Sequence, residues 1–292
     1  MTAQDEIVST TSGASPGPRN RRRNRPVGET SGWVRALQYA GVLIGVVVIW
    51  QLVVTVFHVN QVLVPSATDT AKSLWQSIWV SPSSRVSYVG DALETLKEVV
   101  IGYVLGCAIG LVMAIASLYI RLFAILARPL VVAFQSMPKL ALAPLFVVWF
   151  GFGAASKFTL VAVTTFFPLY VNALVGFQSV DLGLIRMMRS FNANSLQIFR
   201  KVQFLAALPF IFAGLEIAVV HAVTVAVGAE FLGGQSGLGV RIVDSEQTLD
   251  VPSIFAELVL LAIIGVLLHS LVSLARKRTV TWTGEQLLLK DQ

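Results

Sequence analysis

Long apolar stretches separated by short polar segments make up most of the sequence after residue 36. A membrane-spanning helix needs about 20 consecutive, mostly apolar residues. Six stretches reach that length, and we expect each to cross a membrane once: 37–57, 92–118, 122–150, 158–177, 210–232 and 254–274. The pattern therefore predicts an all-α polytopic membrane protein with six transmembrane helices in one domain, residues 33–278.

The polar segments between and around these stretches predict loops and tails. Residues 1–32 are rich in Ser, Thr, Gly, Pro and Arg, which predicts a disordered tail, and residues 279–292 form a second short tail. The basic run in the first tail favours a topology anchor over a lipid or nucleic-acid patch, so no nucleic acid is expected as a partner. An amphipathic piece, 70–80, predicts a surface helix. The first apolar stretch is too long for a signal-peptide core, so we expect it to remain as an anchor.

Composition and charge support this topology. Only 13% of the 292 residues are charged and 55% are hydrophobic, whereas soluble chains average about 25% charged residues. Lys and Arg are enriched in cytoplasmic loops of membrane proteins. With six spans and a cytoplasmic N-terminus, most of the 22 basic residues fall on the cytoplasmic side; the exceptions are Lys72, Arg85, Lys97, Lys139, Lys157 and Arg241.

The third apolar stretch, 122–150, contains Pro129, Pro138 and Pro144, with Lys139 between the last two. Proline removes a backbone donor and interrupts a helix. Broken helices at membrane depth are typical of transport pathways. We count this stretch as one kinked span, because two spans would place the basic loop that follows on the outer side.

The loop 178–209 has the most mixed polarity of the later chain. Asp181 can cap a first helix, and Asn192 tolerates the left-handed conformation that ends one. A second helix can begin at Ser195, with Ile198, Phe199 and Val202 on one face. The loop therefore predicts two short amphipathic helices at an angle, arranged for contact with a soluble partner.

Sites for nucleotide, metal or nucleophilic chemistry lack their sequence signals. There is no P-loop pattern, no His-Glu-x-x-His and no Gly-x-Ser-x-Gly, and His58, His221 and His269 are far apart. The single cysteine, Cys107, excludes a disulfide framework. We expect no enzymatic activity, no metal site and no cofactor bound by this chain.

Polar residues inside or beside the spans are candidates for a translocation path, because ionisable groups in a membrane are costly. Lys139 could attract an anion, and Glu230 could form a gate contact with Arg241; the alternative is that each satisfies a neighbouring helix. The full set of candidates is Gln135, Lys139, Thr164, Thr165, Asn172 and Glu230.

Two further patterns lie in the second span. The charged residues of its first turns, Asp91, Glu94, Lys97 and Glu98, favour a solvated helix end over the lining of an entrance. Gly102, Gly106 and Gly110 repeat every four residues, which allows close helix approach. We expect this approach to occur within the chain rather than at a dimer seam.

Several motifs resemble those of the permease subunits of bacterial ABC importers, in the branch that handles sulfonates, taurine and nitrate. The resemblance covers residues 60–275. It rests on Asn-Ala-Asn-Ser at 192–195, Ile-Phe-Arg-Lys-Val at 198–202, Ala-Ala-Leu-Pro at 206–209, Met-Pro-Lys-Leu at 137–140 and Gly-Leu-Gly at 237–239. The chain departs from the family pattern where Arg186–Met188 replace Glu-Ala-Ala, Asn192 replaces Gly and Leu205 replaces Pro.

The resemblance implies a homodimer in the bacterial inner membrane, with two cytoplasmic ATPase subunits that use ATP and Mg²⁺ and an extracytoplasmic solute-binding protein. It implies that the loop docks on the ATPase through Arg186, Met187, Met188, Arg189, Phe191, Asn192, Ala193 and Ser195. The transported solute would be a sulfonate, taurine, nitrate or a similar small anion. The residues leave two alternatives open: a secondary carrier with Glu216 or Glu257 as its coupling acid, and a membrane-embedded enzyme.

Overall fold

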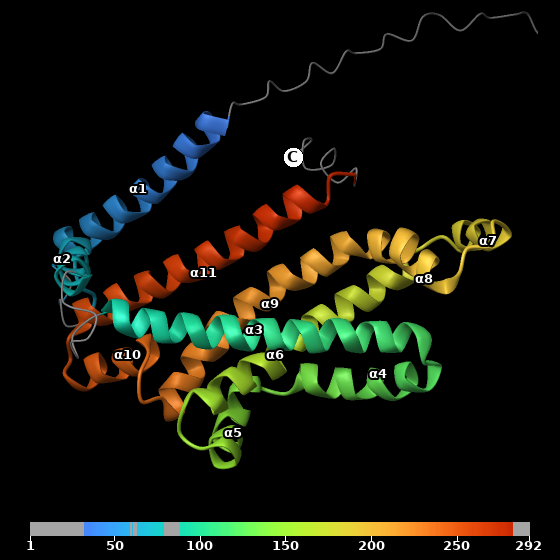
Figure 1. The fold of residues 1–292 in the computed structure, drawn as a ribbon. Coiled ribbons are helices and arrows are strands. Elements are labelled where there is room, and N and C mark those ends of the chain that lie inside the picture. The colour runs from blue at the N-terminus through green and yellow to red at the C-terminus, as the bar shows by residue number, and fades with distance from the viewer. Residues whose placement is uncertain (1–31, 59, 61–62, 79–87, 283–292) are drawn as a thin grey trace, which may run out of the picture. The chain divides into compact units, whose positions relative to one another are not determined.

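A computed structural model describes residues 32–58, 60, 63–78 and 88–282. Two compact parts, Met1–Ile49 and Trp50–Gln292, are treated separately. The regular elements of the described residues are all helical (Figure 1). In order they are α1 (Gly32–Val56), α2 (Ala67–Ile78), α3 (Tyr88–Tyr119), α4 (Arg121–Ser136), the 3-10 turn η1 (Lys139–Leu142), α5 (Ala143–Phe150), α6 (Ala154–Gln178), α7 (Leu182–Ser190), α8 (Ser195–Ile198), the π turn η2 (Phe199–Gln203), α9 (Phe204–Gly233), α10 (Leu238–Gln247) and α11 (Val251–Thr279).

The predicted all-α fold class is confirmed. Among the described residues, α3, α6, the continuous helix Ser195–Gly233 and α11 are long and apolar enough to cross a membrane, which makes four spans. The bent pair α4 and η1–α5 gives a fifth if it counts as one span, and Ala40–Val56 of α1 is a shorter apolar helix. The count of six spans stays a prediction. The expectations for the two tails fall almost entirely outside the described residues.

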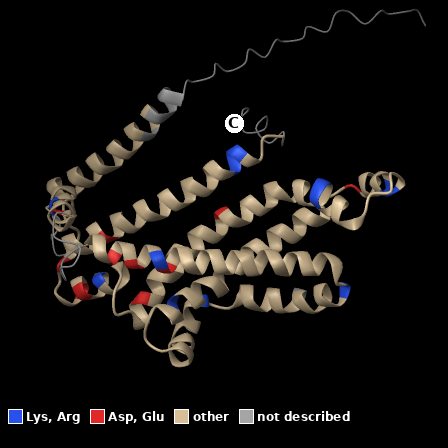
Figure 2. Cartoon of the chain, viewed as in Figure 1, with Lys and Arg blue, Asp and Glu red and all other residues tan. Residues whose placement is uncertain are grey.

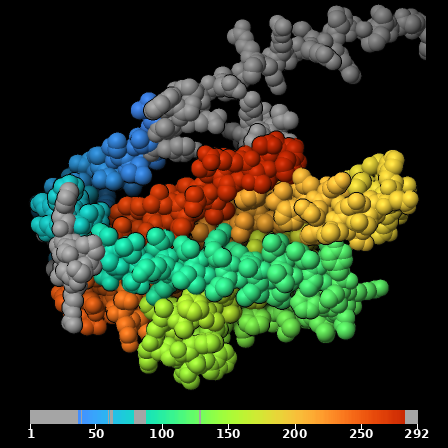
Figure 3. Space-filling view, in the orientation of Figure 1, coloured from blue at the N-terminus to red at the C-terminus, as the bar shows by residue number. Residues whose placement is uncertain are grey.

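The core of the second part is built on α3, α6 and α9. Buried aromatic side chains of α6, among them Tyr170 and Phe177, lie between its two neighbours. By contrast, α11 exposes large apolar side chains such as Leu258, Val266 and Leu271 along its length. On the face shown in Figure 3, α3, α9 and α11 are all visible at the surface. Surface of this kind suits contact with lipid or with another membrane helix.

Glycines on one face of α3 allow its close contact with α6. An added Cβ at Gly106 would collide with the side chain of Thr165 and with the carbonyl oxygen of Ala162. Added Cβ atoms at Gly102 and Gly110 would likewise meet α6. The prediction that these glycines serve packing within the chain is therefore confirmed.

The proline-rich third stretch is sharply bent. Its two halves, Arg121–Ser136 and Lys139–Phe150, meet at 97°. The bend falls where Met137 is extended, with ψ of 139°, as expected for a residue before proline. Pro129 lies inside α4 without ending it, and Pro144 lies in the first turn of α5, where proline is tolerated. Leu140 packs over Gly228 of α9, so one side of the break contacts protein, while Met137 and Leu140 stay partly exposed.

Replacing Gly106 tests the α3–α6 contact. We expect Gly106→Ala to lower the free energy of unfolding by roughly 1–3 kcal/mol, because the added methyl group forces two packed helices apart. Thermal unfolding of the purified protein in detergent measures this. Gly265→Ala is the matched control, since nothing lies within 4 Å of a Cβ at Gly265. An equal effect of the two changes would contradict the packing argument.

Candidate functional site

The loop between α6 and α9 contains a short helix, α7, with well-defined ends. The carboxylate of Asp181 caps its start by accepting a hydrogen bond from the backbone N–H of Gly183 at 2.7 Å. At its end Asn192 has φ of 57°. The N–H of Asn192 bonds to the carbonyl of Arg189, and that of Ala193 to the carbonyl of Met188, which forms a Schellman motif. The predicted cap and the predicted left-handed Asn192 are both confirmed.

The second loop helix, α8, begins at Ser195 as predicted, through a capping box. Asn194 Oδ1 accepts from the N–H of Gln197 at 2.8 Å, and Gln197 Oε1 accepts from the N–H of Asn194 at 3.0 Å. The helix is not a separate element, however. It continues through the π turn η2 into α9, with Pro209 inside the helix. The expected separate second helix is therefore the first turn of the following span.

Apolar contacts fix this helical start to the helix bundle. Ile198 and Val202 are buried, as predicted. The ring of Phe199 lies 5.7 Å from that of Phe177 in α6 and 6.1 Å from that of Tyr119 at the end of α3. This turn therefore contacts α3 and α6 and is continuous with α9.

Helix α7 and the residue after it carry exposed basic and apolar side chains. Arg186 and Arg189 are exposed, and the structure gives neither an ion pair among the described residues. Phe191 is 77% exposed and Leu182 64%. Apolar side chains exposed in this way beside cationic ones are typical of a protein contact surface.

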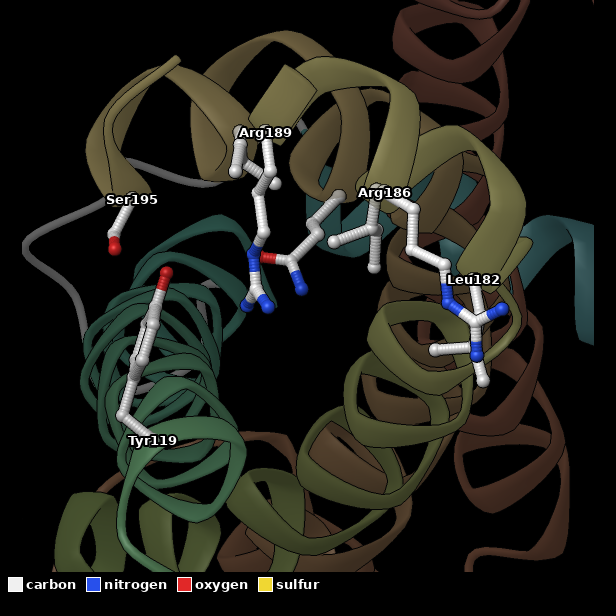
Figure 4. A pocket seen from close by; sticks show the side chains of 8 residues that line it. Tyr119, Leu182, Arg186, Arg189 and Ser195 are labelled. Carbon is white, nitrogen blue, oxygen red and sulfur yellow. The ribbon is translucent and has the colours of Figure 1, made fainter. Parts of the chain in front are cut away.

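A cavity of about 230 Å³ lies under α7. Figure 4 shows that Arg189 and Tyr119 point into it from opposite sides, while Arg186 extends along α7 toward Leu182. Its lining residues are Tyr119, Leu182, Ile185, Arg186, Arg189, Ser195, Ile198 and Gln203. The cavity combines an apolar wall with cationic and hydroxyl groups at its mouth.

Charged groups gather at the far end of the bundle as well (Figure 2). There Lys157 Nζ of α6 lies 2.7 Å from Glu98 Oε1 of α3 and also donates to the carbonyl of Ser236 at 2.9 Å. Both side chains are buried. The prediction that Glu98 belongs to a solvated helix end is wrong, because α6 brings Lys157 against it; Glu94 and Lys97, 2.8 Å apart, are exposed as expected.

The same cluster holds the glycine-rich turn after α9. Glu230 accepts from Thr95 Oγ1 at 2.7 Å and from the N–H of Gly239 at 2.6 Å. Gly237 has φ of 117°, and a Cβ there would collide with Glu230, so only glycine fits. The predicted contact between Glu230 and Arg241 is wrong: among the described residues Arg241 forms its ion pairs with Asp91 and Glu257.

Comparison with known proteins decides the family. Residues 106–280 match the family described as "Binding-protein-dependent transport system inner membrane component". The chain belongs to this family. The matched region contains the loop with α7, the 97° bend and the glycine-rich turn.

Relatives in sequence agree with this assignment, and solved structures share the fold. The permease is 28% identical over 89% of its length to 91% of the putative aliphatic sulfonates transport permease SsuC of Bacillus subtilis. It is 33% identical over 80% of its length to 86% of the riboflavin transport system permease RibX of Chloroflexus aurantiacus. In fold it resembles a chain of the inward-facing MetNI methionine ABC transporter, with a TM-score of 0.54, 22% identity and coverage of 66% of this chain and 95% of that chain.

The chain is thus the permease subunit of an ABC importer, and ATP hydrolysis is carried out by a separate ATPase subunit. The family assignment does not favour the self-contained secondary carrier.

Charge and apolar patterns identified the loop, but Lys157 and Thr95 were missed. Their only sequence signal was a polar residue at the edge of an apolar stretch. This signal does not identify the partner, which lies 59 residues from Lys157 and 135 residues from Thr95.

The predicted path residues occupy different environments in the permease. Gln135 is exposed on α4 and Lys139 is half-buried at the bend. Thr164 and Thr165 are buried, and their hydroxyls donate to the carbonyls of Leu160 and Val161 in their own helix. The amide of Asn172 donates to the carbonyl of Pro168. The structure does not bring these residues into the cavity under α7.

The buried pair of Glu98 and Lys157 can be tested by a double-mutant cycle. We expect Lys157→Met alone to lower the free energy of unfolding by about 3–5 kcal/mol, because it leaves a buried carboxylate without its cation. The double change with Glu98→Gln should cost clearly less than the sum of the single changes. Thermal unfolding in detergent provides the values.

The exposed pair of Glu94 and Lys97 is the matched control. Lys97→Met should cost only about 0–1 kcal/mol, since solvent screens that pair. Equal losses for Lys97→Met and Lys157→Met would show that the buried pair has no special role.

Proposed function

We propose that two copies of this permease form a channel that imports a small anionic solute, such as a sulfonate, taurine or nitrate, and that the ATPase subunits drive it through α7. The observation that supports the proposal is the exposure of α7, whose two arginines form no ion pair among the described residues. If an ATPase subunit is to move the permease, the permease needs a stiff element that is exposed for contact with the ATPase.

In this proposal the docking element runs from Arg186 to Ser195, including Met187, Met188, Phe191 and Ala193. The Schellman motif and the capping box hold it as a rigid bend. ATP-driven closure of the two ATPases, which bind ATP and Mg²⁺, draws the two loops together. Because α8 continues into α9 and Phe199 packs on α3 and α6, the motion reorients the spans.

The orientation of the permease in the membrane follows from the proposed contact between the loop and an ATPase. If α7 meets an ATPase, the loop and the N-terminus face the cytoplasm, in agreement with the distribution of basic residues. The opposite end, with α2 and α10, then faces outward (Figure 1), where a solute-binding protein would deliver its cargo. The exposed apolar surfaces of the spans are available for lipid and for the second copy.

The solute class is supported by the relatives and by the bend. SsuC of Bacillus subtilis and SsuC of Escherichia coli are both named for aliphatic sulfonates, whereas ThiX of Halalkalibacterium halodurans is named for formylaminopyrimidine. Lys139 is the half-buried cation at the bend in the third stretch. A cation at a helix break can attract an anion on its way through the membrane. We keep Gln135, Asn172 and Glu230, with Thr164 and Thr165, as further path candidates.

Charge reversal on α7 tests the docking. We expect the double change Arg186→Glu and Arg189→Glu to reduce co-purification of the ABC ATPase with the tagged permease by at least about tenfold. The change replaces two cations with two anions and so removes charge complementarity to the partner. The control is Lys277→Glu with Arg278→Glu on the exposed end of α11, which changes the net charge equally. Unchanged co-purification of the α7 variant would refute the docking role.

Uptake measurements test the solute class. Cells that express the permease with its partner subunits should take up labelled taurine, an alkanesulfonate or nitrate in an ATP-dependent manner. Lys139→Gln should raise KM by about tenfold, since a charge-assisted contact is lost, and leave ATPase co-purification unchanged. Lys97→Gln, on an exposed pair, is the control. Absence of uptake for every anion in this panel would refute the proposed solute class.

A further inference from the structure

A second cavity, of about 630 Å³, lies at the end of the bundle away from α7. It is walled by α2, by α10 and by the first turns of α3 and α11. A volume of this size fits a small molecule. Neither the docking of an ATPase nor the path candidates involve this cavity, because none of those residues lines it.

Glu257 of α11 lies at the wall of this cavity and has an incomplete set of hydrogen bonds. Its side chain is fully buried. Oε1 accepts from Ser245 Oγ at 3.0 Å and lies 3.9 Å from Arg241 Nε. Oε2 is buried and has no hydrogen-bond partner. A buried acceptor without a partner is rare in native proteins and calls for an additional group, such as a bound ligand.

The charges of the cavity indicate which group fits. Among the described residues its lining contains four carboxylates, Asp69, Asp244, Asp250 and Glu257, and two cationic side chains, Lys72 and Arg241. The hydroxyl of Ser66 donates to Asp69 at 2.6 Å and, together with Lys72, lowers the pKa of Asp69, so this carboxylate is ionised at neutral pH.

The two cations do not balance these acids. The guanidinium of Arg241 also faces Asp91, a carboxylate just outside the lining, at 3.5 Å, and lies over the ring of Tyr88 at 5.3 Å. Lys72 lies 3.6 Å from Asp69. Acidic side chains therefore outnumber basic ones among the described lining residues, and the buried Oε2 of Glu257 has no donor among the described residues.

We propose that this cavity binds a small organic cation through a primary ammonium or guanidinium group, with Oε2 of Glu257 as an acceptor. The N–H groups of such a cation supply the missing donor, and its charge offsets the excess of carboxylates. Ser73 and Ser253, whose hydroxyls are 3.0 Å apart on α2 and α11, offer further acceptors at the wall. None of the proposed path residues lines this site.

Binding of short amines to the full-length permease in nanodiscs of zwitterionic lipid tests this site. The probes are n-butylamine, which is an ammonium ion at neutral pH, and n-butylguanidine. Butyrate and n-butanol have the same chain length and test the need for positive charge. We expect isothermal titration calorimetry, corrected for empty nanodiscs, to show saturable binding of the two cations only.

Variants then locate the site. Glu257→Gln should weaken binding of n-butylamine by roughly ten- to a hundredfold, because a charge-assisted hydrogen bond is lost. Glu246→Gln removes a carboxylate from the same stretch of α10 outside the cavity lining and should leave the affinity unchanged. Gln76→Trp keeps every charge but fills space at the cavity wall, and should also reduce binding; it serves if Glu257→Gln does not fold.

Three results would overturn the proposal. One is no saturable binding of either cation to the natural chain, and another is equal affinity of the natural chain and Glu257→Gln. The third is equal binding of butyrate and n-butylamine. Because no ATPase takes part in these measurements, their outcome is separate from that of the docking experiment on α7.

Discussion

The close approach of α3 and α6 is the constraint on which the rest of the structure depends. Helices in a membrane gain little from the hydrophobic effect when they associate, so they rely on packing and on polar contacts. Gly102, Gly106 and Gly110 supply the packing, since a side chain at any of them would meet α6. The polar contact is the buried pair of Glu98 and Lys157 a turn further along the same interface. The glycines bring the helices together, and the ion pair fixes their register.

Charged side chains are arranged differently at the two ends of this bundle. At the end with α10, carboxylates and cations are packed against one another and against backbone N–H groups, because a charge removed from water is costly unless it is paired. Glu230 there holds the glycine-rich turn by accepting a hydrogen bond from the N–H of Gly239, and it also accepts from Thr95 of α3. At the end with α7, the basic residues are left exposed. The first arrangement stabilises the chain itself, and the second is suited to contact with a partner.

The loop between α6 and α9 connects the exposed helix α7 to the spans. The caps at both ends of α7 make it a stiff helix. The π turn η2 joins α8 to α9 without a break, so α8 is part of the span rather than a hinge. π turns inside helices often mark functional sites. The ring of Phe199, between Tyr119 and Phe177, distributes any force on this turn over two further spans. The coupling role proposed for this loop requires a rigid docking helix and a rigid connection to the spans, and the same few residues supply both features.

The sequence by itself determined the helical membrane class, the cap at Asp181, the helix start at Ser195 and the bend near Pro138, because these follow from composition and from interactions between residues close in the chain. Its motifs also indicated the family. It misplaced Glu98 and the partner of Glu230, and it treated α8 as separate from α9. Only the tertiary structure decided these points. Whether a charged residue near a helix end is solvated or buried depends on which distant helix lies beside it, and Lys157 reaches Glu98 only after α3 and α6 have packed. The cavity at Glu257 depends on tertiary structure in the same way, since four elements must meet before its unpaired oxygen is enclosed.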